Sequence, residues 1–165
     1  MVDSAFSPEA FLDAQVTEVN EKRPPLPVEN PASEDGLYHA VIGDIKMTSG
    51  TYEKGDRIGQ RWLLAQVPLT IEIPKQVQDG LGLKLEKGTL TLTDRAFIDL
   101  TAQGNIDNSK GKNRRQKQYR DACDLNKPGD SFSWRQLIGR PIKVKIDHEM
   151  YQGEPQERIS AVLPA

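Results

Sequence analysis

The sequence from Phe97 to Asn126, FIDLTAQGNIDNSKGKNRRQKQYRDACDLN, passes from an apolar strand through a glycine- and lysine-containing turn into a basic helix. The helix is expected over about residues 112–123, and the proline and glycine of Asn126–Gly129 end it. Six cations with no acid among them lie in the turn and helix: Lys110, Lys112, Arg114, Arg115, Lys117 and Arg120. Clustered cations favour phosphate as a partner, because each neutralised phosphate releases counterions. A solvated helix face is the alternative interpretation.

Strand patterns on both sides of this stretch predict a mainly β domain. Alternating apolar and polar residues predict five strands, at residues 37–47, 60–73, 89–98, 141–151 and 158–163. Pro68 lies within the second strand and indicates a bulge or an edge position, since proline donates no ladder hydrogen bond. Residues 74–88 leave a broken helix and a loop excursion both open. The order of the elements matches a five-stranded Greek-key barrel of the OB type, with one helix between strands three and four.

Charge is divided unevenly along the 165 residues, a length that suits one domain with an appendage. Residues 1–35 carry eight acids against Lys22 and Arg23, whereas the remaining 16 acids are outnumbered by 20 bases. Three prolines in residues 24–28 favour a stiff, extended backbone. We therefore expect an acidic, proline-containing N-terminal arm or linker over residues 1–35 and an OB-like barrel domain over residues 36–165. The arm fits either a hook for a partner or an ordinary solubilising tail.

Composition also indicates the cellular compartment of the protein and whether a cofactor is expected. No apolar run approaches the ~20 residues of a membrane span, and the N-terminus lacks the basic and apolar regions of a signal peptide. We expect a soluble, cytoplasmic protein that does not contact a membrane. The single cysteine, Cys123, forms no internal disulfide and no zinc site alone, and is expected as a small buried hydrophobe. Glycine-rich phosphate loops are absent, so no cofactor is expected.

Three aspartates leave one enzymatic alternative open. Asp94, Asp99 and Asp107 are conceivable as the magnesium cluster of a nuclease, since hard cations prefer carboxylate oxygens. Asp99 and Asp107, however, flank a turn, where aspartate is favoured for local backbone hydrogen bonds. We therefore expect no catalytic residue and no bound metal, and hence a protein that is not an enzyme.

Aromatic and basic residues share faces of the predicted strands. Phe97 lies on the polar face of its strand beside Arg95, an arrangement that suits stacking on nucleic-acid bases. The alternative is that a loop or helix covers Phe97. The candidate nucleic-acid-binding residues come from the first hairpin, strand three, the start of the helix and strand four: Tyr52, Arg57, Arg61, Trp62, Arg95, Phe97, Lys112, Arg114, Arg115, Lys143 and Lys145.

Five segments carry a resemblance to a known family: Phe97–Thr101, Gly104–Asp107, Lys110–Asn113, Tyr119–Ala122 and Phe132–Val144. Together they resemble the C-terminal half of phage-encoded OB-fold proteins that bind single-stranded DNA. The similarity covers roughly residues 97–163, with weaker support from residues 37–41. Similar proteins often have an apolar, glycine-containing segment after the Lys-Gly-Lys-Asn turn, whereas this chain has the basic residues 114–118.

The resemblance implies a non-catalytic protein of phage replication or recombination that coats exposed single strands in the host cytoplasm. Its partners would be single-stranded DNA and, through the acidic arm, replication or recombination proteins. The leading hypothesis is sequence-tolerant binding of single-stranded DNA in a basic, aromatic groove. The alternative is an OB-like protein–protein adaptor without catalytic activity, with the arm or its proline segment as the hook and the basic helix as the counter-surface.

Overall fold

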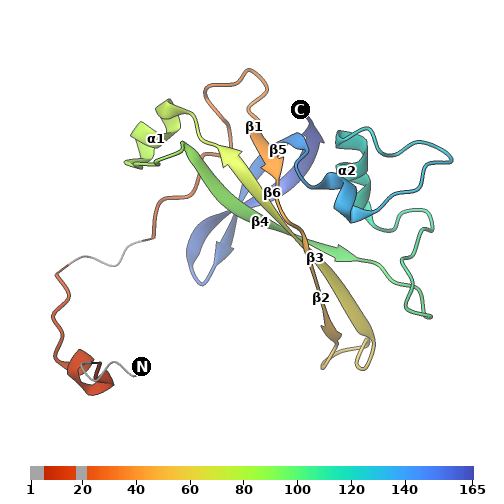
Figure 1. The fold of residues 1–165 in the computed structure, drawn as a ribbon, viewed down its shortest axis with the longest axis horizontal. Coiled ribbons are helices and arrows are strands. Elements are labelled where there is room, and N and C mark those ends of the chain that lie inside the picture. Colours follow the sequence, from red (N-terminus) through yellow and green to blue (C-terminus); the bar gives the residue numbers. More distant parts are fainter. Residues whose placement is uncertain (1–5, 18–21) are drawn as a thin grey trace.

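The computed structural model describes residues 6–17 and 22–165, and these form a mainly β fold with six antiparallel strands in one sheet (Figure 1). The strands are β1 (Tyr38–Ile42), β2 (Lys46–Thr51), β3 (Arg61–Glu72), β4 (Thr89–Ile98), β5 (Pro141–Tyr151) and β6 (Glu154–Pro164). Helix α1 (Lys75–Leu81) connects β3 to β4, and α2 (Arg114–Ala122) lies between β4 and β5. Short 3-10 helices occur at Pro8–Leu12 and Trp134–Leu137.

Strand β3 organises the sheet, because it pairs with β4 along one edge and with β2 and β1 in succession along the other. Strand β5 then pairs with β1, and β6 with β5. No ladder joins β4 to β6 within residues 6–17 and 22–165, so the expected barrel is observed as an open sheet. The helix predicted over residues 112–123 is observed as α2, and residues 75–81 form the helix that the sequence had left open.

A bulge divides the predicted first strand, 37–47, into β1 and β2, and this gives six strands instead of five. Ile42 lies opposite Leu69 and Lys46 opposite Gln66, so one extra residue is accommodated between β1 and β2. Gly43 donates a backbone hydrogen bond to the Pro68 carbonyl at 2.7 Å. Pro68 was expected to mark a bulge or an edge position in its own strand, whereas β3 is paired on both sides and the extra residue lies in the strand opposite Pro68. Strand β2 also continues to Thr51, past the Ser49–Gly50 end that the sequence predicts.

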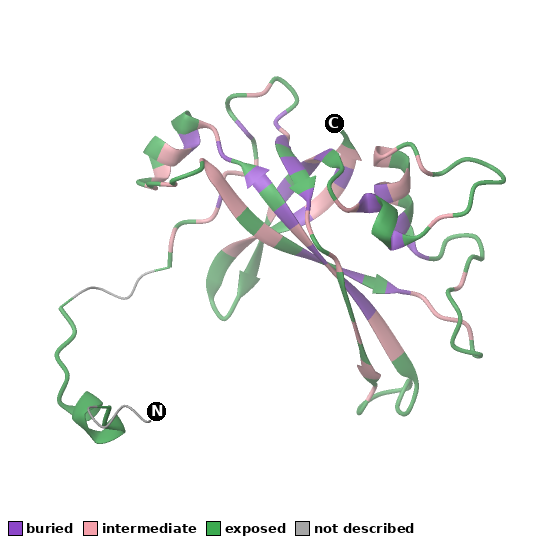
Figure 2. Cartoon of the chain, viewed as in Figure 1, coloured by how far each residue is buried: buried purple, intermediate pink, exposed green. Residues whose placement is uncertain are grey.

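The hydrophobic core lies on the inner face of the sheet and under α2 (Figure 2). Alternate residues of β3 and β5, such as Leu69 and Val144, are fully buried there. Helix α2 packs through Gln116 and Tyr119, the face that helical spacing predicts. Tyr119 also makes an edge contact with Trp134, with ring centroids 5.9 Å apart. The strand pattern and one helical turn therefore account for most of the core.

Part of the predicted arm packs on the sheet. Leu26 is fully buried, and its amide donates to the Glu157 carboxylate at 2.9 Å. His148 Nε2 donates to the Leu26 carbonyl at 2.6 Å, and the Tyr38 hydroxyl donates to the Pro27 carbonyl at 2.8 Å. Burial, reinforced by the nearby negative charge of Glu157, raises the pKa of Tyr38 to about 12. The proline segment thus lies along β5 and β6 and adds Leu26 to the core.

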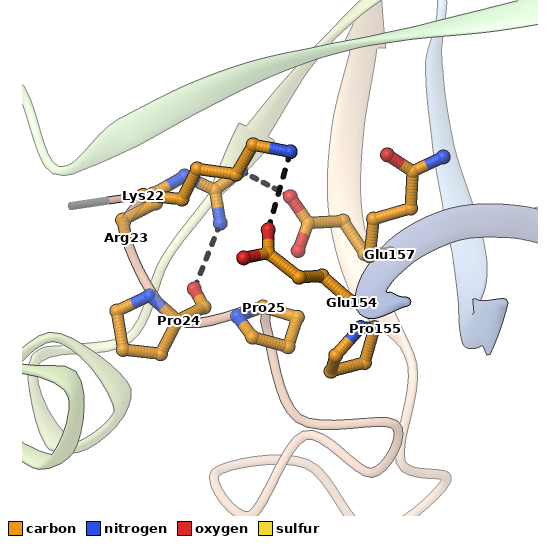
Figure 3. Close-up of a pocket in the computed structure, with 8 residues that line it drawn as sticks. Lys22, Arg23, Pro24, Pro25, Glu154, Pro155 and Glu157 are labelled. Carbon is orange, nitrogen blue, oxygen red and sulfur yellow. Dashed lines mark hydrogen bonds and ion pairs between the residues drawn. The ribbon is translucent and has the colours of Figure 1, made fainter. Parts of the chain in front are cut away.

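The arm crosses the β5–β6 hairpin at a shallow pocket (Figure 3). Lys22 Nζ lies 3.4 Å from a Glu154 carboxylate oxygen, and Arg23 pairs with Glu157. The charges at this crossing are therefore matched in pairs. Residues 6–17 make no such contact and are exposed throughout. The predicted arm also includes residues 1–5 and 18–21, which lie outside the described residues.

In the part of the chain that the structure describes, no helix is both long enough and apolar enough to cross a bilayer.

Candidate nucleic-acid interface

A groove of about 860 Å³ lies between the β2–β3 hairpin, the end of β4 and the loop that follows β4. It brings together six of the eleven candidate residues: Tyr52, Arg57, Arg61, Trp62, Phe97 and Lys112. They come from three segments that are up to 60 residues apart in the sequence, as Tyr52 and Lys112 illustrate. The remaining lining residues are Gly59, Gln60, Leu63, Ile98, Asp99, Leu100, Thr101, Ala102 and Gly104. Three aromatic rings and three cations therefore line the same hollow.

The register of β3 and β4 sets the aromatic part of the groove. Phe97 lies opposite Leu64, on the sheet face that points away from the core. Leu64 is 2% exposed although it is not part of the core cluster, whereas Phe97 is 58% exposed. The exposure of Phe97 excludes the alternative in which a loop or helix covers this ring. A half-buried Trp62, two residues before Leu64, lies on the same face.

The β2–β3 loop supplies a second ring and a cation. The Tyr52 amide donates to the Gln60 carbonyl at 2.9 Å, and the Gly59 amide donates to the Tyr52 carbonyl at 2.8 Å. Gly59 has a φ of +82°, which a residue with a side chain rarely adopts. The Arg57 guanidinium lies 5.8 Å from the centroid of the Tyr52 ring, within the range of a cation–π contact. The loop thus holds a stacked ring and guanidinium at the mouth of the groove.

A clip of four hydrogen bonds, three between Asn113 and Asp99 and one from Asn113 to Asp107, closes the loop after β4 and places Lys112 beside the groove. The Asn113 amide donates to Asp99 Oδ2 at 2.7 Å, and the Asp99 amide donates to Asn113 Oδ1 at 2.8 Å. Asn113 Nδ2 donates to the carbonyls of Asp99 and Asp107, at 3.2 and 2.8 Å. Asn113 has a φ of +53°, a conformation that asparagine tolerates better than most residues. No pattern in the sequence indicates this clip, because Asp99 and Asn113 are 14 positions apart in the chain.

Replacing Asn113 with alanine should destabilise the protein by about 1–3 kcal/mol, because it leaves the partly buried Asp99 amide and the Asp107 carbonyl without these partners. Urea unfolding measures the loss, and hydrogen exchange should localise it to residues 99–113. Asn108→Ala is the matched control, since Asn108 is exposed in the same loop. Equal stability of the two variants would show that the clip does not hold the loop.

Arg115 belongs to a buried network instead of the interface. Its Nε lies 3.3 Å from Asp94 Oδ2, and its terminal nitrogens donate to Gln118 Oε1 at 2.8 Å and to the Ile159 carbonyl at 3.0 Å. The Tyr119 hydroxyl donates to the same Asp94 oxygen at 2.6 Å. Burial raises the pKa of Asp94 and that of Tyr119. These contacts occupy the Arg115 guanidinium, and Arg115 does not line the groove with the other candidates.

Other cations of the basic stretch, residues 110–120, are also engaged by partners within the protein. Lys117 Nζ lies 2.6 Å from Asp121 Oδ2, and Arg120 lies 4.9 Å from the Phe132 ring centroid. Arg114 is exposed at the start of α2 but does not line the groove. Lys112 is therefore the one member of the cluster that the groove includes among the described residues.

Three further candidates lie outside the groove. Arg95 is exposed on the same sheet face as Phe97, opposite Gln66. Lys143 and Lys145 lie on β5, and Lys143 Nζ is 2.9 Å from an Asp35 carboxylate oxygen. The Ser33 hydroxyl and Lys143 lower the pKa of Asp35 by stabilising its charged form. Arg95 therefore adds a cation to the sheet face that carries Trp62 and Phe97. Lys143 and Lys145 lie on β5, which β1 separates from β3.

The aspartates of the nuclease alternative serve separate local structures. Asp99 accepts the Asn113 amide, Asp94 accepts the Tyr119 hydroxyl, and Asp107 accepts the Ser109 amide and hydroxyl at 2.9 and 2.6 Å. The Ser109 bonds lower the pKa of Asp107. Over residues 6–17 and 22–165, no three His, Cys, Asp or Glu side chains lie close enough to hold a metal ion.

No protein-family model matches the chain, and no curated protein is similar to it in sequence.

Proposed function

We propose that this protein binds single-stranded DNA, with little dependence on sequence, in the groove between the β2–β3 hairpin and the end of β4. The observation that carries the proposal is the convergence of Tyr52, Trp62 and Phe97 with three cations on one hollow. Stacking on a ring accepts any base, because every base has a π-face, and the cations hold the backbone. The proposed role is non-catalytic coating of single strands in phage replication or recombination, as the resemblance of residues 97–163 implies.

The order of the strands supports an OB-type fold. When β1 and β2 are taken as one bent strand, five strands follow the order β4, β3, β1–β2, β5 and β6. Helix α2 then lies between the third and the fourth strand of the chain. OB folds bind oligonucleotides on the face of their second and third strands and on the adjoining loops. In this chain those strands are β3 and β4, and they carry Trp62 and Phe97.

The salt dependence of binding tests the phosphate contacts. With three groove cations, the logarithm of the affinity for an oligothymidylate should fall against the logarithm of salt concentration with a slope of about −2, from about −0.7 per neutralised phosphate. Lys112→Ala and Arg61→Ala should each make this slope shallower by about 0.7. Fluorescence anisotropy with a labelled oligothymidylate at several salt concentrations measures both quantities.

Lys145→Ala is the comparison variant for this titration, because Lys145 is an exposed cation outside the groove. We expect its slope to equal that of the wild-type protein. An equal change of the slope in all three variants would show that the binding face also includes β5. Absence of binding to the oligothymidylate at low salt would exclude the proposed function.

The N-terminal arm supports a second candidate function, that of a protein–protein adaptor. Phe6, Phe11, Leu12 and Val16 are 63–85% exposed, and Glu9 and Asp13 lie among them. A short acidic segment with unburied apolar side chains is typical of motifs that become ordered on a partner protein. This candidate predicts partner binding that survives Trp62→Ala and is lost when residues 1–17 are deleted.

A further inference from the structure

We infer that Gly50 is a positioning residue for the proposed interface: the absence of a side chain there lets the Trp62 indole lie flat on β2 and present its other face to the groove. This inference rests on the proposed function and names a determinant of its stacking platform. Gly50 does not itself line the groove, so it acts through Trp62.

The geometry at Gly50 leaves no room for a side chain. Gly50 and Trp62 face each other across the β2–β3 ladder. A Cβ on Gly50 would lie 2.6 Å from Cζ2, 2.7 Å from Cε2 and 2.9 Å from Nε1 of Trp62. Contacts below 3.0 Å do not occur with real Cβ atoms, and all three contacts are to the ring. The indole therefore covers Gly50 and would have to move if Gly50 became alanine.

The backbone gives no other reason for a glycine at this position. Gly50 has no positive φ, unlike Gly55 and Gly59 in the adjoining loop. It lies within β2, where a glycine destabilises a strand by roughly 0.5–1 kcal/mol relative to alanine. The close approach of the Trp62 ring is thus the feature of the described structure that requires glycine.

Contact with Gly50 also explains how Trp62 is presented. Trp62 is half-buried and lines the groove, so one part of the ring is covered and another is open. A ring supported from behind loses little freedom when a base stacks on it, which favours binding. A ring pushed off Gly50 would lie at a different angle to Phe97 and would lose this support.

A double-mutant cycle tests the coupling. Gly50→Ala is introduced into the wild-type protein and into the Trp62→Ala variant, and the Kd for a labelled oligothymidylate is measured for all four proteins. We expect Gly50→Ala alone to raise the Kd about 5-fold or more, because stacking on Trp62 is impaired. In the Trp62→Ala background, Gly50→Ala should leave the Kd unchanged. Gly80→Ala is the matched control, since nothing lies within 4 Å of a Cβ placed on Gly80.

Nuclear magnetic resonance supplies a readout that does not need DNA. The two indole N–H signals belong to Trp62 and Trp134, and Gly50→Ala should shift only the Trp62 signal. Thermal melting of each variant verifies that it is folded.

The possible outcomes separate the inference from the proposed function. If the wild-type protein does not bind the oligothymidylate, the proposed function fails and the role of Gly50 in binding fails with it. If Trp62→Ala weakens binding but Gly50→Ala does not, the inference alone is overturned. It is also overturned if Gly50→Ala weakens binding equally in both backgrounds, because Gly50 would then act through the strand and not through the ring.

Discussion

Phe97→Ala is expected to weaken the binding of single-stranded DNA about 5- to 150-fold, because a ring that stacks on a base contributes ~1–3 kcal/mol. The side chain is 58% exposed on the outer face of β4, so little packing is lost with it. The melting temperature should therefore change by no more than about 2 °C, as for most surface substitutions. Anisotropy titration with an oligothymidylate and thermal melting provide the two measurements.

Tyr151→Ala is the matched control for Phe97→Ala. Tyr151 is an aromatic residue of similar exposure, 52%, at the end of β5, and it does not line the groove. We expect this variant to bind DNA as tightly as the wild-type protein. If Phe97→Ala retained full affinity, or if Tyr151→Ala lost as much, the groove would not be the site where bases stack.

Alternation along β4 and β5 was sufficient to predict which face of these two strands is buried. On β4, Leu92, Ala96 and Ile98 point inward and Phe97 outward, as a period of two requires. The spacing of Gln116 and Tyr119 likewise identified the packed face of α2. Such patterns are local, because the burial of one face is repeated at a fixed interval along the chain. These periodic patterns do not depend on which segments are in tertiary contact.

The remaining features depend on contacts between distant segments. The neighbours of a cation in the chain do not show whether it is exposed or paired. Arg115 on α2 pairs with Asp94, which lies 21 positions earlier on β4. The bulge between β1 and β2 is opposite Pro68, so the proline acts on a strand that is more than 20 residues away. Neither effect has a periodic signature.

The structure brings six of the eleven candidate residues to one groove, and their role in binding stays a prediction. Aromatic residues next to arginines identified Trp62 and Phe97, and the β3–β4 register brings both to one face. Lys143 and Lys145 have the same alternating pattern on β5, yet β1 separates β5 from β3. Composition therefore selects the strands that are able to carry an interface, and the order of the strands in the sheet decides which of them share it.

Burial of Leu26 shows why the boundary at residue 35 could not be placed from composition. The acidic charge and the prolines of residues 1–35 are typical of an unpacked segment. A single leucine between prolines gives no periodic signal, but it reaches the core beside Tyr38 and His148. Two contacts with Glu157 fix the position of the segment on β6. Arg23 forms an ion pair with the Glu157 carboxylate, and the Leu26 backbone N–H donates a hydrogen bond to the same carboxylate.

Leu26→Ala is accordingly expected to lower the free energy of unfolding by about 2–5 kcal/mol, the usual loss when a buried leucine is truncated and a cavity remains. This is a large part of the ~5–15 kcal/mol of a typical domain and corresponds to a fall in melting temperature on the order of 10 °C. Urea unfolding followed by circular dichroism measures the change. Leu12→Ala is the matched control, because Leu12 belongs to the same predicted arm and is 85% exposed.

Comparison of these two leucines decides where the folded domain begins. A large loss for Leu26→Ala with none for Leu12→Ala would make residues 23–30 part of the domain, and leave residues 6–17 as the arm. In that case deletion of residues 1–17 should preserve stability, whereas deletion of residues 1–30 should reduce it at least as much as Leu26→Ala, since it also removes Arg23 from Glu157. If both leucine variants kept wild-type stability, the packing of the proline segment on β5 and β6 would not contribute to the fold, and the domain would begin near residue 36.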